Sequence, residues 1–180
     1  MRRLALTLAT LTALAVTGAA NAAFAQKNPE RNVGEAAPEE DGAVWYAAGD
    51  KAMNAAIEAA RDSLPAFWRS FEEGRGDLHM LKVGLPTPQG GEEHVWVSNV
   101  TRVEDRFMGR LDNQPEAAEG YTLGQDVTFT EAQISDWGYE RDGRLWGGYT
   151  LRVMLNDVPA KEAAEMRAYL SPTPLEAGSR

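Results

Sequence analysis

The fold is decided at residues 80–111, which read MLKVGLPTPQGGEEHVWVSNVTRVEDRFMGRL. Apolar side chains alternate with other residues at 81–85, and a turn rich in Pro and Gly follows. The same period of two predicts further strands at 94–103, which is rich in Val and Trp, and at 106–111. Because short turns join these three segments, we expect an antiparallel sheet.

An amphipathic helix is predicted before this sheet. Asp50 is a suitable N-cap for a helix that runs to about Ser63, because its carboxylate can accept a hydrogen bond from the first turn. Ser63 is then expected to cap a second helical segment, in which Pro65 occupies a first-turn position. One face of the first helix carries the apolar residues Met53, Ala56, Ile57, Ala60 and Leu64.

The remainder of the chain is predicted to return to the sheet and to end in a helix. We expect a short strand at 127–129, one helical turn at 130–134 and a tight hairpin turn at Asp142-Gly143. Clean alternation then predicts one strand over 145–155. A closing helix is expected at 159–170.

The order helix, strands, helix indicates an α+β fold, since strands and helices do not alternate as a parallel sheet requires. We expect an N-terminal helix on a curled, mostly antiparallel sheet or a small, partly open barrel of about five strands, with a C-terminal helix. A single domain is predicted over 44–172, with a frayed C-terminus at 173–180.

The first 25 residues match a secretory signal peptide. A basic start, Met1-Arg2-Arg3, precedes an uncharged apolar stretch at 4–16. Two Ala-x-Ala motifs follow, and they predict cleavage after Ala25 or, as the alternative, after Ala22. We therefore expect a periplasmic or secreted protein without a stable membrane span, a retained anchor being the alternative. The polar and acidic residues 26–43 are expected to form a flexible tether.

Composition excludes several classes of protein. The 180 residues contain no cysteine, which excludes disulfide scaffolds, zinc-thiolate sites, iron-sulfur clusters and thiol nucleophiles. The formal charge is −9, and loss of Arg2 and Arg3 with the signal would make it −11. Nucleic-acid partners are not expected, because proteins that bind them gather Lys and Arg.

Few residues suggest catalysis. The simplest enzyme hypothesis is a hydrolase that acts through Glu93, His94 and Asp136. No metal or cofactor is predicted. In the triplet Glu92-Glu93-His94, only Glu92 and His94 can lie on the same face of a strand, so a third metal ligand would have to come from elsewhere. The absence of a recognisable catalytic motif favours a protein that is not an enzyme.

Aromatic residues suggest binding instead. We expect most of the five tryptophans to lie in the core. Trp137 is predicted to follow Asp136 in a turn, and Trp146 to lie on the more polar face of its strand near Arg152. Together with Trp96 these residues predict a binding patch of Trp96, Trp137, Trp146 and Arg152, since exposed aromatic residues and Arg are enriched at interfaces. A structural alternative is a buried Asp136–Arg152 ion pair that fixes the turn.

Eight short stretches, in order, resemble the YegJ-like family of bacterial domains of unknown function (DUF2314). The resemblance spans about 44–155 and implies a compact α+β domain that is often exported, but no activity. With the residues above, it predicts an exported, non-enzymatic binding domain whose partner is an unknown protein or envelope component. The stretches are 55–61, 67–68, 82–85, 92–97, 109–115, 124–127, 134–137 and 148–152.

Overall fold

The computed structural model describes residues 50–157 and 159–176. The predicted signal peptide at 1–25, the tether at 26–43 and the first residues of the predicted domain, 44–49, lie outside the described residues. Within the described part of the chain, no helix has the length and apolar character needed to cross a bilayer.

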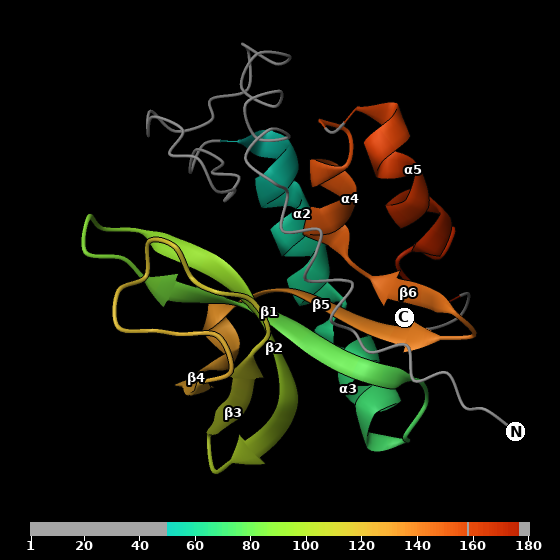
Figure 1. Ribbon diagram of the computed structural model, residues 1–180. Helices are drawn as coiled ribbons and strands as arrows, with labels where there is room; N and C mark the ends of the chain where they lie inside the picture. The colour runs from blue at the N-terminus through green and yellow to red at the C-terminus, as the bar shows by residue number, and fades with distance from the viewer. Residues whose placement is uncertain (1–49, 158, 177–180) are drawn as a thin grey trace, which may run out of the picture.

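Two helices open the domain (Figure 1): α2 (Lys51–Asp62) and α3 (Leu64–Glu72). The predicted cap is present, because the Asp50 carboxylate accepts the Met53 N–H at 2.8 Å. Pro65 sits in the first turn of α3 as predicted. Ser63 is the N-cap residue of α3 as predicted, but its side chain makes no capping hydrogen bond, because its hydroxyl donates to carbonyl groups of the preceding turn, including that of Ala59 at 2.8 Å.

A single open sheet of six strands follows, and every pairing in it is antiparallel. The strand order β4-β3-β2-β1-β5-β6 places β2 and β1 at the centre, with β5 between β1 and the edge strand β6. The α+β class is confirmed, and the sheet is not closed into a barrel. The strands are β1 (Asp77–Pro86), β2 (Glu92–Val103), β3 (Arg106–Leu111), β4 (Asp126–Phe129), β5 (Ile134–Arg141) and β6 (Arg144–Gly147), with a 3-10 turn, η3 (Glu131–Gln133), before β5.

Apolar cores cover both faces of the sheet. The principal core joins α2 and α3 to one face through side chains that include Phe67, Leu81 and Trp137. The second core lies on the other face, where Met80 and Leu145 pack against α4 (Tyr149–Met154) and α5 (Ala160–Tyr169). In Figure 1, α2, α4 and α5 gather at one end of the sheet.

Strand β5 was not predicted, and the proposed turn at Asp136 and Trp137 is wrong. The strand ISDWGYER is buried at its first six positions, so its burial does not alternate between the two faces. A strand covered on both sides lacks the period-two pattern by which half-buried strands are found.

The predicted strand over 145–155 is also wrong beyond its first residues. Strand β6 stops at Gly147, and α4 begins at Tyr149. Gly147 and Gly148 have φ values of 78° and 62°, in the left-handed region that favours glycine. These two residues turn the chain from the sheet into the helix, which the alternation alone did not reveal.

The C-terminal segment lies along the outer edge of β6. Leu170 forms a parallel bridge with Leu145, and the Gly147 N–H donates to the Pro174 carbonyl at 2.9 Å. Residues 173–176, which we expected to fray, therefore make defined contacts, including an ion pair between Glu176 and Arg141. This segment covers an edge that would otherwise expose unpaired backbone groups.

Candidate functional site

The three residues of the hydrolase hypothesis do not share one site. Glu93 faces the principal core side of β2, where its carboxylate accepts three consecutive backbone N–H groups at 116–118, at 2.8–3.1 Å. His94, the next residue of the strand, points to the opposite face. Asp136 lies two strands away on β5. Glu93 holds the loop after β3, and the hydrolase hypothesis has no support.

Asp136 is a buried structural carboxylate. It is fully buried and accepts hydrogen bonds at 2.7–3.0 Å from the backbone N–H groups of Trp137, Tyr149 and Thr150 and from the Thr150 hydroxyl. Burial raises the pKa of Asp136, while the hydrogen bond from Thr150 and the charge of Lys82 oppose that rise. Four donors occupy both oxygens, so Asp136 fixes the start of α4.

Lys82 lies beside Asp136 on the same face of the sheet. It is the cross-strand neighbour of Asp136 on one side and of Trp96 on the other. Its Nζ donates weakly to the Thr150 hydroxyl at 3.4 Å and stands 5.7 Å from the centre of the Trp96 ring. Burial lowers the pKa of Lys82, and the negative charge of Asp136 opposes the change. The contact between Lys82 and Thr150 joins the sheet to α4.

Two further titratable groups extend this face. Asp112 accepts the Ser98 hydroxyl at 2.7 Å, and burial raises the pKa of Asp112 in spite of that bond. His94 keeps an exposed edge, but the surrounding protein lowers its pKa to about 4, with further contributions from the positive charges of Lys82 and Arg61. His94 is therefore neutral at physiological pH.

The predicted binding residues do not form one surface. Trp137 is fully buried, and its Nε1 donates to the Ala60 carbonyl at 3.0 Å. Trp96 and Trp146 are both half-buried, but Trp96 packs against the second core and Trp146 against the principal core, on opposite faces of the sheet. Of the four, Arg152 lines a cavity that is described below.

Arg152 holds the turn that precedes its own helix. Its Nε donates to the Gly147 carbonyl at 3.0 Å, and its two Nη atoms donate to Ser171 at 2.9 and 3.0 Å. Burial lowers the pKa of Arg152, which the charge of Asp136 opposes. Asp136 and Arg152 both act on this turn, as the structural alternative supposed, but each through its own backbone contacts.

The structure also brings together a Ser–His pair that was not predicted. Ser70 Oγ lies 3.1 Å from His79 Nε2. The single hydroxyl proton of Ser70 is directed to the Arg75 carbonyl, so the His79 ring donates to Ser70 and cannot act as its base. Ser70 is also buried. The pair ties the end of α3 to the start of β1.

A cavity of about 560 Å³ lies where β6, α4, α5 and the C-terminal segment meet. We call it the arginine cavity, because Arg144, Arg152 and Arg167 line it. No Asp or Glu is present among the described residues of its wall. Arg144 and Arg167 are exposed, whereas Arg152 is half-buried. Three positive groups thus meet at one surface of a chain whose formal charge is −9.

Each arginine is anchored by backbone carbonyl groups. Arg144 Nη1 donates to the carbonyls of Ala168 and Leu170 at 3.0 and 3.2 Å. Arg167 donates to the carbonyl of Leu155, at the end of α4. These bonds satisfy carbonyl groups at helix ends and fix the guanidinium groups in place. Sequence analysis found only Arg152, because the three arginines come from three separate elements.

No metal-binding site is evident in the described part of the chain. Among residues 50–157 and 159–176 there is no group of three or more His, Cys, Asp or Glu residues that could hold an ion. The arginine cavity instead offers hydrogen-bond donors and positive charge, which suit an anion.

Comparison with known proteins gives a family and no activity. The family model described as "Uncharacterized protein conserved in bacteria (DUF2314)" matches residues 50–170. The "Uncharacterized protein YegJ" of Escherichia coli K12 is 33% identical over 120 residues, which cover 67% of this chain and 78% of that protein. No solved structure matches.

A longer protein also contains a related segment. The "Putative ankyrin repeat protein NMB1133/NMB1171" of Neisseria meningitidis serogroup B is 31% identical over 135 residues, or 69% of this chain. The match covers 53% of that protein, so the chain spans about half of its length.

Proposed function

The chain belongs to the DUF2314 family of uncharacterised bacterial proteins, and we propose that it is an exported binding domain that captures a small anionic group in the arginine cavity. The anion is either free or carried by an envelope component. The observation that carries the proposal is the meeting of Arg144, Arg152 and Arg167 at one cavity with no carboxylate in its described wall.

The charge of the rest of the molecule supports a small anion over a polymer. A chain with a formal charge of −9 repels a long polyanion such as nucleic acid, whose binding requires many Lys and Arg contacts. The arginine cavity concentrates positive charge locally, so it favours a compact group that does not extend over the acidic surface.

Export is supported by residues 1–25 alone, through their basic start, apolar stretch and Ala-x-Ala motifs. The test is fractionation of a bacterium that expresses the full chain, with mass spectrometry of the N-terminus of the product. We expect a periplasmic or secreted product that begins at Gln26 or Ala23. A product that retains Met1 in the cytoplasm would contradict export.

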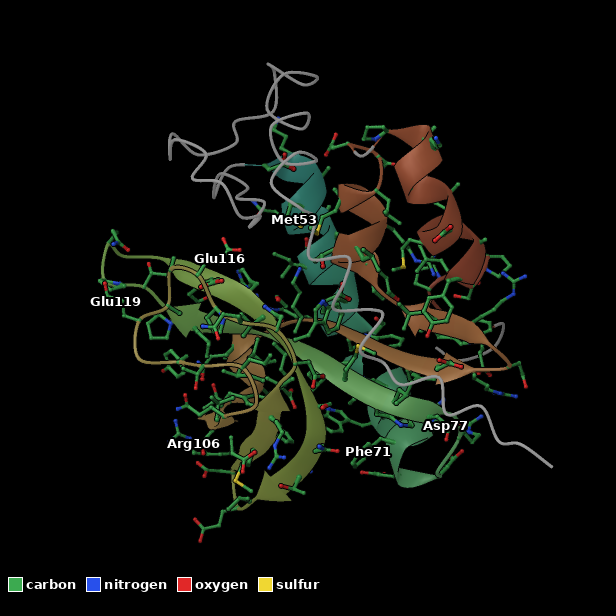
Figure 2. All side chains as sticks on the ribbon, in the orientation of Figure 1. Met53, Phe71, Asp77, Arg106, Glu116 and Glu119 are labelled. Carbon is green, nitrogen blue, oxygen red and sulfur yellow. The ribbon has the colours of Figure 1, made fainter. Side chains whose placement is uncertain are left out.

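Anion capture is tested by isothermal titration calorimetry of the full chain with phosphate, sulfate, acetate and citrate. Arg144→Gln and Arg167→Gln each remove one exposed guanidinium and should weaken binding roughly tenfold, since hydrogen bonds to charged groups contribute about 1.5–3 kcal/mol. Arg106→Gln is the matched control, because Arg106 is exposed on β3, far from α4 and α5 in Figure 2.

The control variant should bind as the natural chain does. Binding of no anion, or equal losses in all three variants, would overturn the proposal. The circular dichroism of each variant shows whether its fold is intact.

A further inference from the structure

The charge at the arginine cavity matches a dianion. Three guanidinium groups contribute three positive charges. The C-terminal ends of α4 and α5 also meet this cavity, through the carbonyls of Leu155 and Leu170, and each helix end carries roughly half a negative charge. About two positive charges are left over, before the charge of Asp136 behind Arg152 is counted. A singly charged carboxylate would neutralise only part of this surplus.

The donors of the cavity also exceed what a carboxylate can accept. Three guanidinium groups carry fifteen N–H groups, of which six donate to backbone carbonyls or to Ser171. Nine N–H groups remain without an acceptor among the described residues. They project from three different elements, β6, α4 and α5, so they can approach an anion from three directions.

A phosphate monoester fits both observations. It carries two negative charges once its second proton is lost, and its three terminal oxygens are strong acceptors that suit the forks of arginine. A carboxylate offers two oxygens and one charge, and a phosphodiester likewise has one charge. Sulfate also has two negative charges, but it carries no esterified organic group.

We propose that the arginine cavity binds phosphate monoesters, with Arg144 and Arg167 as exposed forks and Arg152 as a half-buried one. This inference rests on the proposed capture of an anion by the same cavity. The volume of about 560 Å³ is larger than a phosphate group requires and leaves room for part of the esterified body.

The experiment compares four anions by calorimetry with the full chain: glycerol 3-phosphate, dimethyl phosphate, acetate and sulfate. We expect glycerol 3-phosphate to bind at least tenfold more tightly than dimethyl phosphate or acetate. Arg144→Lys keeps the charge but removes the fork, so it should weaken glycerol 3-phosphate binding roughly tenfold. Arg106→Lys, which lies outside the cavity, should leave the affinity for glycerol 3-phosphate unchanged.

The pH dependence gives a second and independent readout. The second pKa of a phosphate monoester is about 6, so its affinity should rise about tenfold as the pH is raised from 5 to 7.5. No histidine lines the described wall, and its charged groups are the three arginines of β6, α4 and α5. Sulfate is the control for titration of Asp136, which lies behind Arg152, because the charge of sulfate is constant in this pH range. The affinity for sulfate should therefore not rise.

The source of the phosphate is distinguished with vesicles. Vesicles that contain phosphatidic acid display a monoester, and vesicles that contain phosphatidylglycerol display a diester. Binding to the first and not to the second, with competition by glycerol 3-phosphate, would identify a lipid headgroup. Binding of the soluble ester alone would identify a free metabolite, and either result supports the inference.

Two results would overturn it in different ways. Equal or tighter binding of acetate or dimethyl phosphate would reject the monoester and leave anion capture standing. No binding by any of the four anions would reject both proposals.

Discussion

Asp136 and Arg152 hold the two ends of one glycine turn. Asp136 accepts the N–H groups of Tyr149 and Thr150, which follow the turn, and Arg152 donates to the carbonyl of Gly147, within it. Arg152 reaches on to Ser171 and lines the arginine cavity. The turn therefore couples β5 to the wall of the cavity.

Asp136→Asn should destabilise the protein by about 3 kcal/mol. An amide cannot accept all four hydrogen bonds that reach the carboxylate, and each buried donor left without an acceptor costs roughly 1–3 kcal/mol. Urea unfolding measures the loss. Asp126→Asn, which removes an exposed ion pair with Arg110, should cost less than about 1 kcal/mol. Equal effects of the two variants would contradict the structural role of Asp136.

Gly147→Ala should cost more than about 3 kcal/mol. Gly147 has a φ of 78°, and a Cβ at this position would collide with the Trp137 carbonyl oxygen. Gly143→Ala is the matched control, because Gly143 has a φ of 69° but open space around the added carbon. The control should cost only about 1 kcal/mol of backbone strain. Thermal unfolding of both variants separates collision from strain, and similar melting temperatures would contradict the geometry.

Glu93→Gln should release the loop after β3 while the sheet stays folded. The Gln side chain has a single acceptor oxygen and no negative charge, so it holds the N–H groups of Ala117 and Ala118 more weakly than the carboxylate does. Hydrogen exchange at these two amides should accelerate at least tenfold. In Figure 2 the loop is marked by Glu116 and Glu119. Glu92→Gln, on the exposed neighbouring position, should leave both exchange rates unchanged.

His94 should make the protein less stable in mild acid. Its pKa is about 4 in the folded protein and 6.5 in the unfolded chain. The unfolded chain therefore takes up the proton first, and stability that is present above pH 6.5 is lost as the pH falls toward 4. The side chain is partly solvated, so the expected loss is only about 1 kcal/mol.

The variant His94→Gln isolates this contribution. Burial raises the pKa values of Asp112 and Asp136, so these groups favour the folded state in acid and act in the opposite direction. Urea unfolding at pH 7.5 and 4.5 should show a larger loss for the natural chain than for His94→Gln. An equal change in both proteins would contradict the neutral state of His94.

Local signals in the sequence predicted several elements of the fold. The cap at Asp50, the alternation in β1 to β3 and the Asp142-Gly143 turn were all visible in the sequence, and each is confirmed. Strand β5 was missed because both of its faces are covered, and α4 was missed because LWGGYTLRVML alternates through a glycine turn. Tertiary burial and backbone conformation decided these two segments.

The candidate site was less predictable than the fold. Arg152 was singled out, but its supposed neighbours Trp137 and Trp146 belong to the core. Arg144 and Arg167 carry no local signal, because exposed arginines at the edge of a strand or on a helix are common. They meet Arg152 only through the packing of α4 and α5 over the end of β6.

The pairing of β1 with β5 joins segments that lie far apart in the sequence. Leu81 and Trp137 are register partners, so a loop of more than fifty residues must close before β5 and β6 can join the sheet. The outer edge of β6 is completed by residues 170–174. Long-range closure of this kind slows folding. For a chain that we propose to be exported, slow folding would keep the polypeptide unfolded, and so able to pass through a translocation channel, until export is complete.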